Sequence, residues 1–182
     1  MRFLDFTSSK YPPAVLTGIL VFLLAVMNYP SLRTGDKEVY DVGHAVLPKL
    51  PDFVNDLQAG IIFIILLYQL PGWSKSKYTS YLTFMCVMFF FRLLTIHVTV
   101  LPRPAGTDEC KLGLFEKCND YIFSGHTTFN ILTSYFIGAP MWPAVPIITS
   151  VGTISSRAHY SVDVLLAWLL FFALKCNMPV RI

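Results

Sequence analysis

The stretch YSVDVLLAWLLFFALKC, residues 160–176, is almost wholly apolar and carries one acid, Asp163, near its start. An α-helix needs about 20 apolar residues, with a range of roughly 17 to 25, to cross the hydrocarbon core of a bilayer. The stretch therefore predicts a membrane-spanning helix. A carboxylate inside such a helix is costly unless it is paired, so Asp163 is also expected to have a partner.

The rest of the chain has the same character. Its 182 residues are 54% hydrophobic and 14% charged, whereas soluble domains carry about 25% charged residues; the mean hydropathy is +0.57. Apolar runs bounded by polar or proline-rich breaks cover residues 13–29, 57–70, 78–101, 126–139, 141–155 and 160–176. The fourth and fifth runs contain Thr, Ser and Pro, which is typical of helices packed inside a bundle. The sequence predicts an all-α, polytopic membrane protein in which residues 1–182 form one domain of six transmembrane helices.

Charge and cysteine usage argue against a nucleic-acid-binding protein and against a protein with a structural metal site. Lys and Arg together number 14 against 11 Asp and Glu, and the net charge of +3 is too small and too scattered to indicate nucleic-acid binding. The four cysteines form no CxxC pair and have no histidine at zinc-ligand spacing, so no metal and no cofactor are predicted. Cys110 and Cys118 lie in a polar loop and form either a disulfide, if that loop faces an oxidising compartment, or two free thiols.

The order of the spans brings two distant histidines to one face of the membrane. The first apolar run has no cleavage pattern at its end, so it is expected to be retained as a span. With six spans, the loops after the first, third and fifth lie on the side opposite both termini. His126 begins the fourth span and His159 precedes the sixth, so both emerge at that face. The distribution of Lys and Arg favours cytosolic termini, which turns the histidines toward the lumen or exterior. The membrane itself, whether that of the Golgi, the endoplasmic reticulum or the cell surface, is left open.

His159 and Asp163 are four residues apart and therefore lie on one face of a helix. A carboxylate one turn away accepts from one imidazole nitrogen, fixes the tautomer and stabilises positive charge on the ring. The other nitrogen is then free to attack or to take a proton. The alternative is a polar cluster that only caps the helix start.

The stretch FSGHTTF, residues 123–129, adds a second histidine at a helix start. Gly125 lets a phosphate approach the backbone, and with Ser124 it precedes a helix whose free N–H groups attract anions. His126 can then protonate a leaving oxygen. A lone histidine at an interface is more often structural, but a second histidine with its own carboxylate at the same face favours an acid/base pair.

Two arginines are candidate phosphate ligands. Arg157, two residues before His159, offers planar forked donors, although alone it would be interpreted as an interface anchor. Arg92 lies about 15 Å of helix before the Pro102 break and is expected to face the bundle interior, either as a phosphate ligand or as the structural partner of an acid. His97 has no acid at helical spacing and is interpreted as a hydrogen-bonded structural residue.

Four stretches, in order along the chain, resemble the signature motifs of sphingomyelin synthases and related sphingolipid synthases, which belong to the lipid phosphate phosphatase superfamily. LPDFVND (residues 50–56) resembles the first motif and RLLTIHVTVLPRPAG (residues 92–106) the second. CNDYIFSGHT (residues 118–127) and HYSVDVLLAW (residues 159–168) closely resemble the third and fourth. Four ordered motifs are far more specific than either histidine alone.

The resemblance implies a six-span bundle of the lipid phosphate phosphatase type that moves a phosphorylated headgroup, with phosphocholine first, from a glycerophospholipid to ceramide. By motif position the catalytic triad is His126, His159 and Asp163, and the third motif adds Asp120 to the substrate-binding residues. The expected partners are the membrane and lipids: phosphatidylcholine or phosphatidylethanolamine as donor, and ceramide or diacylglycerol as acceptor. A homo-oligomer is left open.

Two other functions use the same residues. With water as the acceptor, the triad would make a lipid phosphatase or a phospholipase C-like hydrolase, but the Lys-containing motif of the superfamily's phosphatases is not evident. A protein that only binds lipid would have no need for His126, His159 and Asp163 together.

Overall fold

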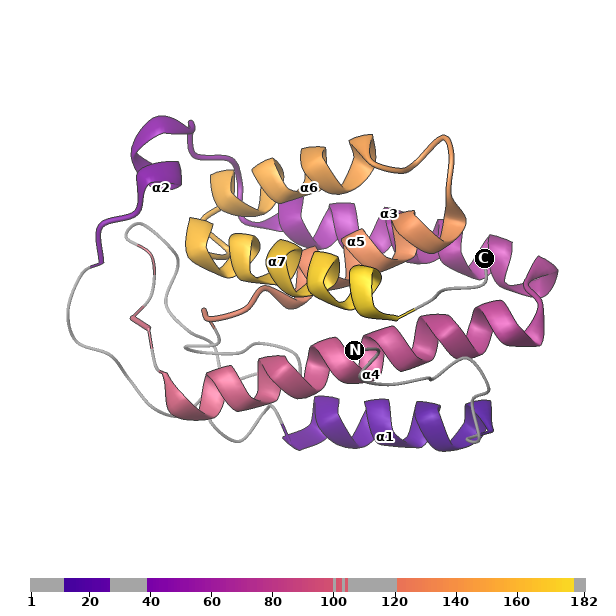
Figure 1. Cartoon of the computed structure of the whole chain (residues 1–182). Coiled ribbons are helices and arrows are strands. Elements are labelled where there is room, and N and C mark those ends of the chain that lie inside the picture. Colours follow the sequence, from indigo (N-terminus) through magenta and orange to yellow (C-terminus); the bar gives the residue numbers. More distant parts are fainter. Residues whose placement is uncertain (1–11, 27–38, 100, 103, 105–120, 179–182) are drawn as a thin grey trace.

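The structure, a computed structural model, describes residues 12–26, 39–99, 101–102, 104 and 121–178. Across these ranges every regular element is a helix and no strand occurs, which confirms the predicted all-α class (Figure 1). Asp120, Cys110 and Cys118 lie outside the described ranges. The two other cysteines, Cys86 and Cys176, are free thiols.

A helix lies at each of the six predicted spans, and one further helix was not predicted. The elements are α1 Pro13–Val26, α2 Val42–Val46, α3 Phe53–Gln69 with the 3-10 turn η2 Leu70–Gly72, α4 Lys75–Val98, α5 Gly125–Ile137, α6 Ala144–Ser155 and α7 Ser161–Asn177. α3 begins four residues earlier than expected because the chain turns into a helix directly after Pro51, whose carbonyl accepts from the N–H of Val54. Asp56 therefore lies in the first turn of the helix rather than before it.

Side-chain caps fix where several helices begin. The hydroxyl of Ser74 accepts from the N–H of Lys77 at the start of α4, and Ser124 does the same for Thr127 at the start of α5, both at 3.1 Å. Such caps satisfy backbone donors that the helix leaves without partners. The position of His126, in the first turn of α5, is thus set by the cap at Ser124.

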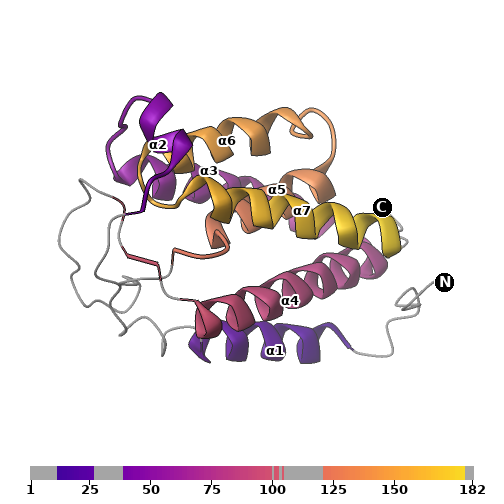
Figure 2. The same cartoon turned by 60° about the vertical axis from the view of Figure 1, so that its left-hand side comes forward.

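The helices pack around α5. This helix contacts α3, α4, α6 and α7, while α1 packs on the outer side of α4 (Figures 1 and 2). The buried side chains at the centre are mostly large and apolar and come from α4, α5 and α7: Phe84, Met88, Ile131, Leu132, Phe136, Ala167 and Phe171. The figures also place α2 at the same end of the bundle as the start of α7.

Within the described part of the chain, two helical segments are long and apolar enough to cross a membrane, Phe53–Gly72 and Lys75–Val98. Pro13–Val26 and Ala144–Ser155 are apolar but shorter. Arg92, on the second long segment, is only 6% exposed, which confirms that it faces the bundle interior. The membrane crossing of all six predicted spans remains a prediction.

Candidate active site

The start of α5 and the connection before α7 meet at one end of the bundle. Their two histidines, His126 and His159, lie with ring centroids 6.2 Å apart although 33 positions separate them in the numbering of the chain. The order of the spans predicted these rings to be neighbours. At this separation both rings are within reach of one phosphate group.

His159 is held against a buried carboxylate. Its Nδ1 lies 3.4 Å from Oδ2 of Asp163, and the two side chains are 6% and 0% exposed. The same Oδ2 accepts a 3.0 Å hydrogen bond from the backbone N–H of Tyr160, so Asp163 also caps α7. The pairing and capping interpretations of this acid are therefore both realised. The carboxylate therefore lies beside Nδ1, and Nε2 is the ring nitrogen outside this contact.

His126 has a carboxylate of its own, which the sequence analysis did not identify. Its Nε2 lies 3.1 Å from Oδ1 of Asp56, in the first turn of α3. This pair is open, because the side chains of His126 and Asp56 are 36% and 80% exposed. The two candidate catalytic histidines thus each lie beside an aspartate, one pair buried and one facing outward.

The guanidinium of Arg92 lies against the start of α5. Its Nε donates to the carbonyl of Phe123 at 2.9 Å, and a Cβ added to Gly125 would lie only 2.5 Å from its Nη1. The observed reason for a glycine at 125 is therefore the close approach of this arginine. Phe123 has a φ of 66°, a left-handed backbone that non-glycine residues rarely adopt. Ser124 uses its hydroxyl to cap α5.

Arg157 contacts a segment that the sequence analysis left without a role. Its Nη2 donates to the carbonyls of His44 and Leu47, at 2.6 and 3.2 Å, and thereby holds the end of α2. Its Nη1 is buried and finds no hydrogen-bond partner within the described part of the chain. The observed contacts of Arg157 are thus structural, and they do not support its predicted role as a phosphate ligand.

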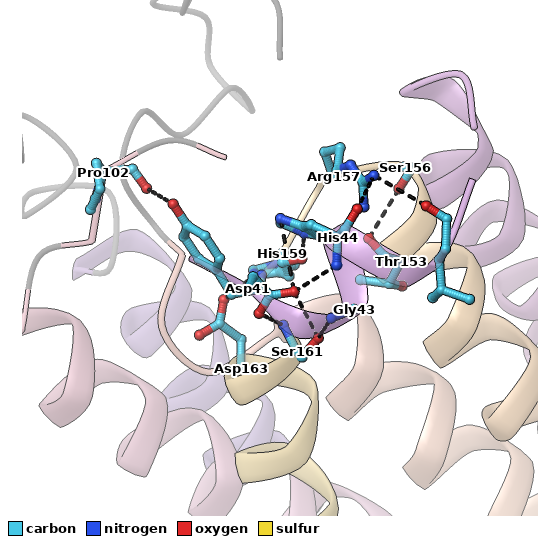
Figure 3. Close-up of polar contacts among 12 residues, drawn as sticks. Asp41, Gly43, His44, Pro102, Thr153, Ser156, Arg157, His159, Ser161 and Asp163 are labelled. Atoms are coloured by element: carbon cyan, nitrogen blue, oxygen red, sulfur yellow. Dashed lines mark hydrogen bonds and ion pairs between the residues drawn. The ribbon is translucent and has the colours of Figure 1, made fainter. Parts of the chain in front are cut away.

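Asp41 and His44 lie beside the backbone around His159, and neither was identified from the sequence (Figure 3). His44 contacts the backbone of His159. Burial raises the pKa of Asp41, but the N–H of His44 and the hydroxyl and N–H of Ser161 outweigh this and lower the pKa below its ordinary value. The available signal was an aspartate directly before a short stretch that can form a helix, because Asp is a preferred N-cap residue.

A family model and curated relatives match this chain. The model described as PAP2 superfamily C-terminal matches residues 117–176. Phosphatidylinositol:ceramide inositolphosphotransferase 2 of Arabidopsis thaliana is 30% identical over 93% of the chain and 70% of its own length. The chain belongs to the sphingolipid synthase family. Two further curated proteins are similar to it. Phosphatidylinositol:ceramide inositolphosphotransferase 3 of the same plant is 27% identical over 91% of the chain and 74% of its own length. Phosphatidylcholine:ceramide cholinephosphotransferase 1 of Caenorhabditis elegans is 22% identical over 87% of the chain and 45% of its own length.

The matched segment of the chain contains the three predicted triad residues. Residues 117–176 carry His126, His159 and Asp163, whereas Asp56 and Arg92 reach the site from earlier helices. Among the residues that the structure describes, no three His, Cys, Asp or Glu side chains are grouped so that they could hold a metal ion.

Proposed function

We propose that the chain transfers a phosphorylated headgroup from a glycerophospholipid to ceramide and releases diacylglycerol. The observation that carries the proposal is the buried His159–Asp163 pair with His126 beside it. The matched relatives are named as ceramide phosphotransferases for inositol phosphate or phosphocholine. Because the plant inositolphosphotransferases match at higher identity than the worm cholinephosphotransferase, we place inositol phosphate ahead of the phosphocholine that the motifs favoured.

In the proposed mechanism His159 activates the transfer. Either its Nε2 attacks phosphorus and forms a phosphohistidine, which the ceramide hydroxyl then attacks, or it takes the proton of that hydroxyl for direct attack. In both routes the bond from phosphorus to the diacylglycerol oxygen breaks. Asp163 stabilises the positive charge that develops on the ring.

His126 is proposed to protonate the departing diacylglycerol oxygen. An acid must carry its proton before the step, and the carboxylate of Asp56, 3.1 Å from Nε2, orients this ring. In the covalent route His126 then takes a proton from the ceramide hydroxyl and is restored as an acid. In that route His126 thus acts first as acid and then as base, while His159 is first the nucleophile and then the leaving group.

Positive charge at the start of α5 is proposed to stabilise the phosphate. Arg92 lies against Gly125, and the first N–H groups of α5 add the positive end of the helix dipole. Asp120 remains assigned to substrate binding by its motif position alone, and Arg157 by its charge and its place two residues before His159. Ser124 and Gly125 contribute by placing the helix end.

The apolar outer faces of the helices support insertion into a membrane. Large side chains that are exposed on the bundle occur on α1, α3, α6 and α7: Val21, Phe22, Ile64, Leu67, Ile147, Ile148, Leu165 and Leu169. In water such faces would be unfavourable, whereas lipid tails cover them at no cost. We propose six membrane spans, with the histidine end toward the lumen or exterior.

The test of this function is product identification. Membranes that contain the protein are incubated with labelled ceramide and, separately, phosphatidylinositol, phosphatidylcholine or phosphatidylethanolamine. Inositol phosphorylceramide is the expected product, and sphingomyelin or ceramide phosphoethanolamine would keep the reaction but change the headgroup. Release of phosphate or phospho-headgroup without any ceramide product would instead establish a hydrolase.

The same assay tests the buried pair. Asp163→Asn and His159→Ala are expected to reduce turnover by about 1,000-fold or more, because the ring loses its orientation or its reactive nitrogen. His97→Ala is the matched control, since His97 donates to the Leu93 carbonyl within its own helix and is exposed. Thermal unfolding in detergent shows whether each variant is folded. Full activity in folded Asp163→Asn would contradict the proposed mechanism.

A further inference from the structure

Residues 41–47 form hydrogen bonds with every second residue between Arg157 and Ser161, where α6 connects to α7. Arg157 donates to the carbonyls of His44 and Leu47. The carbonyl of His159 accepts from the ring of His44, and the hydroxyl of Ser161 accepts from the N–H of Gly43 at 3.2 Å. His159 is thus the middle of three anchored residues (Figure 3).

Asp41 joins the starts of two helices. Its Oδ1 accepts from the N–H of His44 at 2.9 Å and from the hydroxyl of Ser161 at 2.8 Å. Its Oδ2 accepts from the N–H of Ser161, also at 2.8 Å. One carboxylate therefore caps both α2 and α7, and its side chain is only 8% exposed. The first turn of α7 carries Asp163, so Asp41 fixes the helix that presents the partner of His159.

The ring of His44 contacts His159 through the backbone. Its Nε2 lies 3.0 Å from the carbonyl oxygen of His159, and because a carbonyl only accepts, this nitrogen carries the hydrogen. Its Nδ1 lies 3.9 Å from Oδ1 of Asp41. The ring also packs on Tyr160, with centroids 5.3 Å apart.

The fit between the two segments is tight. A Cβ on Gly43 would collide with the hydroxyl oxygen of Ser161 and lie 2.7 Å from a methyl carbon of Ile154. Only glycine allows this approach without displacing the start of α7 or the end of α6. α2 is too short to be stable alone, so its order depends on these contacts.

We propose that Asp41 and His44 are positioning residues for the transfer reaction, holding the backbone of His159 and the first turn of α7 so that Nδ1 of His159 stays on Asp163. The inference rests on the proposed function, because it assigns His159 as the reacting group. Neither residue is assigned a contact with substrate; both act through the His159 carbonyl and Ser161. A shift of about 1 Å in a reacting group can cost roughly 100-fold in rate.

The test compares two variants of His44, one that keeps an N–H donor for the His159 carbonyl and one that does not. His44→Phe keeps a ring on Tyr160 and removes the N–H, whereas His44→Gln keeps an N–H donor. We expect kcat to fall roughly 10- to 100-fold in His44→Phe, with KM for ceramide unchanged, and to recover largely in His44→Gln. Wild-type kcat in His44→Phe, or equal losses in both variants, would overturn the proposal. His97→Phe is the control histidine.

A second readout separates this inference from the reaction itself. Amide hydrogen exchange over residues 157–165 is expected to speed up in Asp41→Asn and His44→Phe, whatever reaction the wild type catalyses, and unchanged exchange would overturn the positioning role. If wild-type membranes form no ceramide product, the proposed function fails while this measurement still stands. Should His44→Phe not fold, Ser161→Ala carries the test, because it removes only the hydroxyl that links Asp41 to Gly43.

Discussion

The two His–Asp pairs differ in their exposure, and this difference suits their proposed roles. Asp163 is fully buried beside His159, so its charge acts on the ring with little screening by water. Asp56 is 80% exposed beside His126 and is screened. The buried pair is therefore expected to contribute more to transition-state stabilisation than the open one, and the open pair provides the side from which a substrate can reach the site.

Replacement of Asp56 tests the open pair. Exposed ion pairs contribute less than about 1 kcal/mol, so Asp56→Asn is expected to lower kcat by only about 2- to 5-fold. The loss should shrink at high salt in the assay buffer, because screening weakens the pair in the wild type. Asp52→Asn, at an exposed position of the preceding turn, is the control. A loss as large as that of Asp163→Asn would show that Asp56 acts directly on substrate.

At the residue scale, local spacing decided what could be predicted. His159 and Asp163 are one helical turn apart, so their pairing follows from the sequence. Asp56 and His126 are 70 positions apart, and no periodicity connects them. The role of Gly125 was also out of reach, because the guanidinium that lies on it comes from α4.

Among the elements, α2 is the one whose order depends most on its neighbours. Asp41 has a lowered pKa, so the stabilisation from its hydrogen bonds is present above the pKa of the unfolded chain and is lost as the pH falls through the folded value. At neutral pH, Asp41→Asn is expected to cost about 1–2 kcal/mol of the free energy of unfolding, or roughly 2–8 °C in Tm. Asp41→Asn and the wild type should converge as the pH falls below about 4.

Thermal unfolding in detergent at pH 7 and pH 3 measures this convergence. Asp52→Asn is again a fitting control, since Asp52 precedes α3 without a side-chain capping hydrogen bond. A difference between wild type and Asp41→Asn that persists unchanged at pH 3 would mean that the charge of Asp41 does not carry the stabilisation.

The six longer helices could be predicted from hydropathy because each is a long apolar run, and only their ends moved by a few residues. α2 could not, because it has five residues and no apolar periodicity of its own. Its caps come from Asp41 in the local sequence and from Arg157, 110 positions beyond Leu47. Short elements of this kind are set by tertiary contacts rather than by propensity.

For the whole molecule, the crossing of α3 is the sharpest test of the membrane arrangement. Lys49 lies before α3 and Lys75 after η2, and both are exposed. If α3 spans the membrane, these positions lie on opposite sides. Each lysine is replaced by cysteine, one at a time, in a variant whose four native cysteines are changed to serine.

A membrane-impermeant thiol reagent is then applied to sealed vesicles of known orientation, before and after permeabilisation. Because Lys49 is at the histidine end, Lys49→Cys is expected to react only from the lumenal or exterior side, and Lys75→Cys only from the cytosolic side. Reaction of both from one side would show that α3 does not cross. The opposite pattern would keep the spans but place the histidines in the cytosol, where ceramide and donor lipid would have to be taken from the cytosolic leaflet.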